Sequence, residues 1–126
     1  MTANSAPTLE ISQRFYFDAA HRLLREIEAE GSRRIHGHTY RAEVAVQGSA
    51  NPATGMVMDL GLIRLEVEKV RARLDHHFLD EVTGLGIPTL ENLCAFIAKT
   101  MQGLGLTLTR VSVWRESLGD RCDLRL

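Results

Sequence analysis

Apolar and polar residues alternate in two stretches of the first half of the chain, Leu9 to Ala19 and His36 to Gly48. Because successive side chains of a strand point to opposite faces, this alternation predicts two half-buried β-strands. The apolar face of the first comprises Leu9, Ile11, Phe15, Phe17 and Ala19, and that of the second Tyr40, Ala42, Val44 and Val46.

Two later stretches carry apolar residues at helical spacing. Asp59 and Thr89 are good N-cap residues, so we expect one helix from Asp59 to about Leu74 and another from Thr89 to Gly103. The predicted buried stripes are Ile63, Val67, Val70 and Leu74 in the first helix, and Leu90, Leu93, Cys94, Ile97, Met101 and Leu104 in the second.

The end of the chain returns to alternation. Thr107 to Glu116 predicts a third strand, with Glu116 near its end, and Arg121 to Leu126 is a possible fourth. The order ββααβ(β) lacks βαβ units, which favours an α+β fold with an antiparallel sheet and two helices packed on one face. We expect a flexible N-terminal tail over residues 1–8 and a single domain over residues 9–126.

Composition excludes few classes of protein. The 126 residues are 44% hydrophobic and 25% charged, as in ordinary soluble globular proteins. A net charge of −1 argues against a nucleic-acid or anionic-membrane partner. No apolar run approaches the roughly 18 residues that span a bilayer, and the N-terminus does not resemble a secretory signal. Two cysteines, Cys94 and Cys122, make no disulfide framework, so we expect a cytoplasmic protein.

The five histidines form two clusters, and the first suggests a metal site. His36 and His38 share one face of the second predicted strand, and His21 continues the apolar face of the first. Three imidazoles from the ends of two neighbouring strands could bind zinc and leave a fourth position open. Other divalent metals also accept imidazole. Each histidine taken alone also fits an ordinary position at the edge of the core.

The second cluster offers acid–base chemistry. Asp75 precedes His76, and a carboxylate beside an imidazole fixes its tautomer and raises its basicity. The alternative is a charged helix C-terminus, where histidine is favoured by the macrodipole. The charged loop of residues 22–35 is longer than a hairpin needs. Its arginines could bind phosphate or simply be solvated: Arg22, Arg33 and Arg34.

Six motifs follow one another between about residue 10 and residue 116. They are Phe17-Asp18-Ala19-Ala20-His21-Arg22-Leu23, His36-Gly37-His38-Thr39-Tyr40, Gly55-Met56-Val57-Met58-Asp59, Leu74-Asp75-His76-His77-Phe78-Leu79, Pro88-Thr89-Leu90-Glu91-Asn92 and Glu116. In this order they resemble the 6-pyruvoyl-tetrahydropterin synthase family, which includes the bacterial 6-carboxytetrahydropterin synthases of queuosine biosynthesis.

The resemblance implies the tunnelling (T-) fold and homotrimers or homohexamers with active sites between subunits. It implies Zn²⁺ held by His21, His36 and His38. The implied substrate is 7,8-dihydroneopterin triphosphate, converted to 6-carboxy-5,6,7,8-tetrahydropterin or to 6-pyruvoyl-tetrahydropterin. The remaining residues that match the family's functional positions are Glu116, which would anchor the pterin ring, Thr89 near that ring, and His76, the proton-transfer histidine oriented by Asp75.

One position departs from the family pattern. The family's catalytic cysteine stands four residues before His36, where this chain has Ser32. A thiol has a pKa near 8.5 and ionises far more readily than a serine hydroxyl. Ser32 could be activated by the zinc ion or by His76. Alternatively, Glu28 or Glu30 could be the base, as in family members that use glutamate and cleave the side chain toward 6-hydroxymethyl-dihydropterin. A third alternative is a protein that binds pterin and metal with negligible activity.

Overall fold

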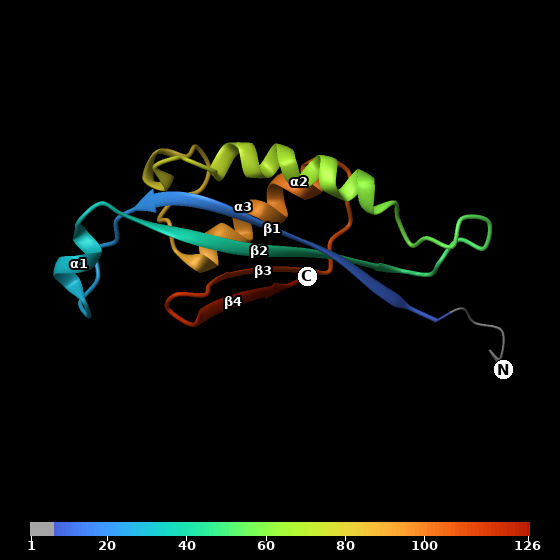
Figure 1. The fold of residues 1–126 in the computed structure, drawn as a ribbon, viewed down its shortest axis with the longest axis horizontal. Coiled ribbons are helices and arrows are strands. Elements are labelled where there is room, and N and C mark those ends of the chain that lie inside the picture. The colour runs from blue at the N-terminus through green and yellow to red at the C-terminus, as the bar shows by residue number, and fades with distance from the viewer. Residues whose placement is uncertain (1–6) are drawn as a thin grey trace.

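Two long helices cover one face of an antiparallel sheet in the computed structural model, which describes residues 7–126 (Figure 1). Within that range the sheet has the strand order β1-β2-β3-β4. This arrangement confirms the predicted α+β class and the order of the main elements. The elements are β1 (Leu9–His21), α1 (Ala29–Arg33), β2 (His36–Gly48), α2 (Leu60–Leu74), the 3₁₀ turn η1 (Leu79–Glu81), α3 (Leu90–Gly103), β3 (Arg110–Arg115) and β4 (Asp120–Arg125).

The core lies between the sheet and the two helices. In the β1–β2 register Phe17 pairs with Tyr40, and their fully buried rings stack with centroids 5.1 Å apart. Helix α2 packs on β1, and α3 packs on β3 and β4. The predicted apolar stripes supply much of this core, in which Ile63, Val70, Leu74, Leu93, Cys94, Ile97 and Met101 are buried.

Both long helices begin where their capping residues predict. The Asp59 side chain accepts a hydrogen bond from the Gly61 backbone N–H at 2.8 Å, and the Thr89 hydroxyl accepts one from the Asn92 N–H at 3.2 Å. These bonds satisfy N–H groups that the first helical turn leaves without a partner. The start of α3 is thereby fixed at the end of the sheet that carries the histidines.

The possible fourth strand is real and forms a hairpin with β3. Arg115, the last residue of β3, pairs directly with Asp120, the first residue of β4. Side chains alternate along β3, so Arg115 shares the face of the buried Val111 and Val113. Glu116 follows the strand and lies in the connecting turn.

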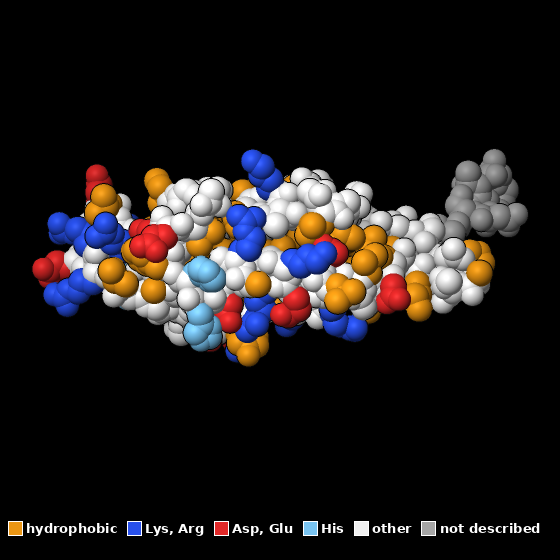
Figure 2. Space-filling view, turned by 90° about the horizontal axis from the view of Figure 1, so that it is seen from above, with side chains coloured by type: hydrophobic (Ala, Val, Ile, Leu, Met, Phe, Trp, Pro, Cys, Tyr) orange, Lys and Arg blue, Asp and Glu red, His pale blue; other side chains and the backbone are white. Residues whose placement is uncertain are grey.

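The loop of residues 22–35 folds back on itself around the short helix α1. Glu28 precedes α1 in a left-handed conformation, with φ 56°. Ser32 closes the loop through its backbone, since its N–H donates to the Glu28 carbonyl and its carbonyl accepts from the Leu23 N–H at 2.7 Å. Figure 2 shows charged side chains of both signs among hydrophobic ones at this end of the molecule.

The predicted N-terminal tail falls mostly outside the described residues. Residues 1–6 are not described, and Pro7 and Thr8 are exposed without regular structure. Among the described helices, none combines the length and the apolar character that crossing a membrane requires.

Candidate active site

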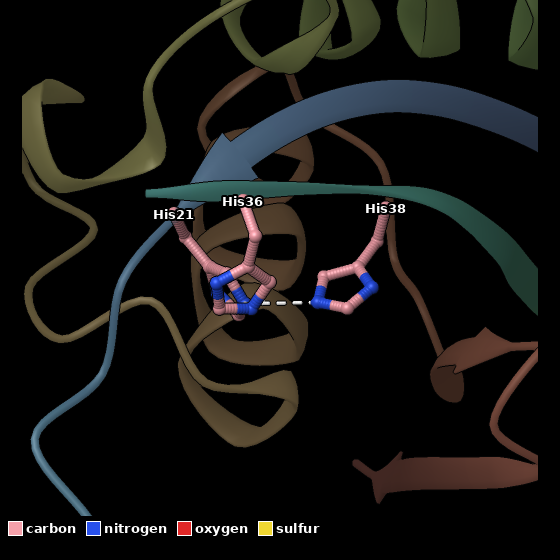
Figure 3. A group of neighbouring side chains, drawn as sticks. All are labelled: His21, His36 and His38. Atoms are coloured by element: carbon pink, nitrogen blue, oxygen red, sulfur yellow. Dashed lines mark hydrogen bonds between the residues drawn. The ribbon is translucent and has the colours of Figure 1, made fainter. Parts of the chain in front are cut away.

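Three histidine rings converge at one end of the sheet (Figure 3). The β1–β2 register places His21 directly opposite His36, and His38 lies two residues further along β2. The Nε2 atom of His21 is 3.0 Å from the Nε2 of His36 and 3.1 Å from the Nε2 of His38. The strand register alone therefore brings together the three residues predicted as a metal site.

The tautomers of two rings suit metal binding. The Nδ1 atom of His21 lies 2.9 Å from the Pro88 carbonyl oxygen, and the Nδ1 atom of His36 lies 2.7 Å from the Arg34 carbonyl oxygen. Because a carbonyl only accepts, each Nδ1 carries the proton and each Nε2 presents a lone pair. Two lone pairs that face each other at 3.0 Å repel unless a cation lies between them. The arrangement thus fits a divalent metal, which zinc-binding imidazoles approach at about 2.0–2.1 Å.

The surroundings of His21 and His38 favour the neutral form of these two imidazoles. Burial lowers the pKa of His21, and burial together with the charge of Arg115 lowers the pKa of His38 to about 4. Neutral imidazole is the form that binds a metal, so protons compete little for the ring nitrogens of His21 and His38 near neutral pH.

A cavity of about 1060 Å³ opens at the histidine triad. It unites most residues proposed from the sequence: Ser32, Thr89 and the possible bases Glu28 and Glu30 all line it. The three loop arginines considered from the sequence do not line this cavity. Among the described lining residues the loop contributes Arg25, which is paired with Glu28 at 3.3 Å, and not Arg22, Arg33 or Arg34.

Ser32 is 7% exposed and lies in the wall of this cavity, whereas both cysteines lie elsewhere. The Cys94 thiol donates to the Cys122 carbonyl at 3.4 Å between α3 and β4. Burial and the neighbouring Cys122 raise the pKa of Cys94 to about 12. Neither cysteine is among the residues that line the cavity, so neither substitutes for a thiol at Ser32.

Asp75 and His76 form the predicted pair, but at a second hollow. The Asp75 Oδ2 is 2.9 Å from the His76 Nδ1. The backbone N–H of Asp18 and the His76 ring hold the pKa of the Asp75 carboxyl below its usual range. The second hollow, of about 560 Å³, is bordered by His76, His77 and Asp18, and within residues 7–126 it shares only His38 with the first.

The backbone around His76 is strained and firmly attached to β1. His76 has φ 58°, a left-handed conformation that costs a non-glycine residue about 1–2 kcal/mol. Its N–H donates to the Asp18 carbonyl at 2.6 Å, and the Ala20 N–H donates to the His77 carbonyl at 3.1 Å. An isolated parallel bridge joins Ala20 to Phe78. These bonds hold the imidazole of His76 in its exposed position.

Glu116 borders neither hollow. Its side chain is 68% exposed and lies 3.6 Å from the Arg41 guanidinium. The Trp114 indole N–H also donates to it, at 3.3 Å. The carboxylate is therefore accessible, but not to a ligand held wholly within the triad cavity of one chain.

Sequence reasoning missed several residues that shape the cavity. Pro88 orients His21 through its carbonyl, a backbone role that residue type does not reveal. Tyr40 is fully buried, and its hydroxyl lies 3.2 Å from the His21 Nδ1. Arg115 and Asp120 form an ion pair on the cavity wall. The Nη1 atom of Arg115 lies 3.3 Å from the Nε2 atom of His38. For Arg115 the sequence did hold a signal, because the alternation of β3 continued to Arg115 places its side chain on the same face as Val111 and Val113.

Comparison with known proteins agrees with this geometry. The pattern of the 6-pyruvoyl tetrahydropterin synthase family matches residues 10–125. The 6-carboxy-5,6,7,8-tetrahydropterin synthase of Synechocystis is 35% identical over 102 residues, covering 76% of this chain and 77% of the relative. The dihydroneopterin monophosphate aldolase of Pyrococcus furiosus is 34% identical over 108 residues, covering 82% and 87%. The structure of the Caenorhabditis elegans 6-pyruvoyl tetrahydropterin synthase shares the fold, with a TM-score of 0.81 at 23% identity over 95% of this chain and 96% of that one.

Proposed function

Because the chain belongs to the 6-pyruvoyl tetrahydropterin synthase family, and is a lyase of that family with its tunnelling fold, we propose that it acts on 7,8-dihydroneopterin triphosphate. The proposed product is 6-carboxy-5,6,7,8-tetrahydropterin, of the queuosine pathway, or 6-pyruvoyl-tetrahydropterin. The observation that carries this proposal is the convergence of three Nε2 atoms at the base of a cavity that also contains Ser32 and Thr89.

His21, His36 and His38 are the proposed ligands of Zn²⁺. When bound, the ion would polarise the oxygens of the substrate side chain and make their protons more acidic. The chain prepares the site by hydrogen-bonding two of the rings to the carbonyls of Pro88 and Arg34, which directs their free nitrogens into the cavity.

His76 is the proposed proton-transfer residue. Its Nδ1 faces the Asp75 carboxylate, which leaves Nε2 to accept and return a proton. His76 borders a different hollow from Ser32 and Thr89, which supports an active site shared between copies. In a homotrimer or homohexamer one copy would supply the triad and its neighbour would supply His76.

Thr89 and Glu116 are the proposed pterin-binding residues. Thr89 lines the triad cavity, and Glu116 presents an accessible carboxylate outside it. A carboxylate accepts two parallel N–H donors well, which the pterin ring offers. In a shared site the two residues would contact one ring from different copies.

Identification of products by mass tests the function. Zinc-loaded protein is incubated with 7,8-dihydroneopterin triphosphate, and the expected product is carboxytetrahydropterin together with acetaldehyde. Pyruvoyl-tetrahydropterin would select the other synthase reaction. Binding of the pterin without turnover of any dihydropterin would reject the enzyme function in favour of a silent pterin-binding protein.

A second candidate is cleavage of the substrate side chain toward 6-hydroxymethyl-dihydropterin. It is favoured by Glu28 and Glu30, which line the cavity near Ser32 and could serve as bases. The Pyrococcus relative that is named an aldolase supports this alternative. The same assay, run with dihydroneopterin triphosphate and monophosphate in parallel, separates the two reactions by product mass.

Substitutions of Ser32 test its role as the base. Ser32→Cys is expected to raise kcat about tenfold or more, because a thiol ionises more readily and general base catalysis is worth roughly 10²–10⁴ in rate. Ser32→Ala is expected to lower kcat about tenfold. Ser117→Cys, in the exposed β3–β4 turn, controls for the introduction of a thiol. Unchanged kcat in Ser32→Ala would assign the role of base to Glu28 or Glu30.

A further inference from the structure

The wall of the triad cavity carries a partly buried arginine that the proposed function has not used. Arg115 is the last residue of β3, and its side chain is 13% exposed. Two of its nitrogens, Nε and Nη2, donate to the two carboxylate oxygens of Asp120. The β3–β4 register sets these residues opposite each other, so the hairpin itself fixes the orientation of the guanidinium.

The third nitrogen of Arg115 faces the histidines. Nη1 lies 3.3 Å from the Nε2 of His38, which in turn lies 3.1 Å from the Nε2 of His21. A guanidinium stays protonated at any physiological pH, so a permanent positive charge borders the point where the three rings meet. Among the described residues that line the cavity, the other guanidinium belongs to Arg25, which is 42% exposed and paired with Glu28.

Stability does not explain the Arg115–Asp120 pair. The Asp120 side chain is 40% exposed, and an ion pair that water reaches contributes at most about 1 kcal/mol to stability. The pair also places a cation beside nitrogens suited to a metal ion, which disfavours metal binding unless Asp120 compensates. A pair that contributes little stability and opposes the metal is more simply explained by an interaction with a ligand.

We propose that Arg115 is a further catalytic residue, whose Nη1 donates a hydrogen bond to the substrate oxygen that becomes negatively charged beside the histidine triad. This role rests on the proposed lyase function. Asp120 is then a positioning residue that holds the guanidinium and balances its charge. A fixed donor directed at a developing oxyanion stabilises the transition state more than the ground state, so its loss lowers kcat more than it raises KM.

Arg115→Met tests this role, because methionine replaces the guanidinium with an uncharged chain of similar length. We expect kcat to fall about 10²–10³-fold, the usual effect of losing one oxyanion donor, with KM changed less than about threefold. The matched control is Arg121→Met, which removes an arginine of the same hairpin that is paired with Asp123 and stacked on Trp114 away from the cavity. The control is expected to retain wild-type kcat.

Zinc affinity supplies a readout that does not depend on activity. Competition with a chromophoric chelator should show that Arg115→Met binds Zn²⁺ at least as tightly as wild type, because a neighbouring positive charge has been removed. Asp120→Asn leaves that charge uncompensated and is expected to weaken zinc binding about tenfold. Weaker zinc binding in Arg115→Met would assign Arg115 a structural role and overturn the proposal.

The outcomes separate this proposal from the proposed function. Wild-type turnover together with near-normal kcat in Arg115→Met overturns the role of Arg115 alone. A wild-type protein that turns over no dihydropterin overturns the lyase function and this role with it. If Arg115→Met does not fold, Arg115→Lys is the alternative test. Lysine keeps the positive charge but lacks the Nη1 donor beside His38. An unchanged kcat in Arg115→Lys overturns the proposal.

Discussion

His38→Ala is expected to weaken zinc binding by more than about 100-fold and to reduce turnover to background. Loss of a group that merely orients a ligand typically costs 10–100-fold in metal affinity, so loss of a ligand itself should cost more. His38 also holds the central place at the site, since it borders both hollows and contacts both His21 and Arg115. Zinc content and competition with a chelator measure the effect.

The matched control for His38→Ala is His77→Ala. His77 is exposed, and its Nδ1 is directed at the Asp75 carbonyl rather than at the triad. Full zinc content is expected in this variant. Circular dichroism should show both variants folded, because His38 contributes little to the apolar core. A His38→Ala protein that binds zinc as tightly as wild type would show that the metal site lies elsewhere.

His76→Ala is expected to lower kcat about 10²–10⁴-fold while zinc affinity stays unchanged. The imidazole acts as a proton-transfer group in our proposal, and its ring is bound to Asp75 and not to the triad. The separation of zinc content from kcat distinguishes this loss from that of His38→Ala. A His76→Ala protein with wild-type kcat would remove His76 from the mechanism.

Mixed assemblies test whether the site is shared between copies. His38→Ala and His76→Ala chains, each inactive alone, are co-expressed with different tags and purified as mixed oligomers. A site that takes its triad from one copy and His76 from the next would be intact in about a quarter of random neighbours, so activity should return to about that fraction. No recovery in verified mixed oligomers would place the complete site within one chain.

The sequence predicted those parts of the fold that are specified locally. The alternation from Leu9 to Ala19 marks β1 by its period of two, and the caps Asp59 and Thr89 fix the starts of two helices through hydrogen bonds within three residues. The triad was also predictable, because strand periodicity decides which face His36 and His38 share. The approach of His21 to both rings needed only that β1 and β2 be antiparallel neighbours.

Features that depend on distant pairing were not predictable. The pairing of Arg115 with Asp120 requires the exact start of β4, which the short segment from Arg121 left uncertain. The position of Glu116 outside the cavity follows from the end of β3 at Arg115, after which the chain turns. The separation of His76 from Ser32 depends on backbone bonds between residues 75–78 and β1 that no local pattern encodes.

The last residues of β1 serve two purposes at once. The side chain of His21 belongs to the triad, while the backbones of Asp18 and Ala20 hold the segment that carries His76. In an assembly with shared sites, these two purposes concern two different active sites. A copy with an altered strand end would therefore inactivate two active sites, one on each side of it. The fraction of active sites lost in a mixed oligomer would then exceed the fraction of altered copies. A defect at this strand end would act dominantly over the wild-type chain.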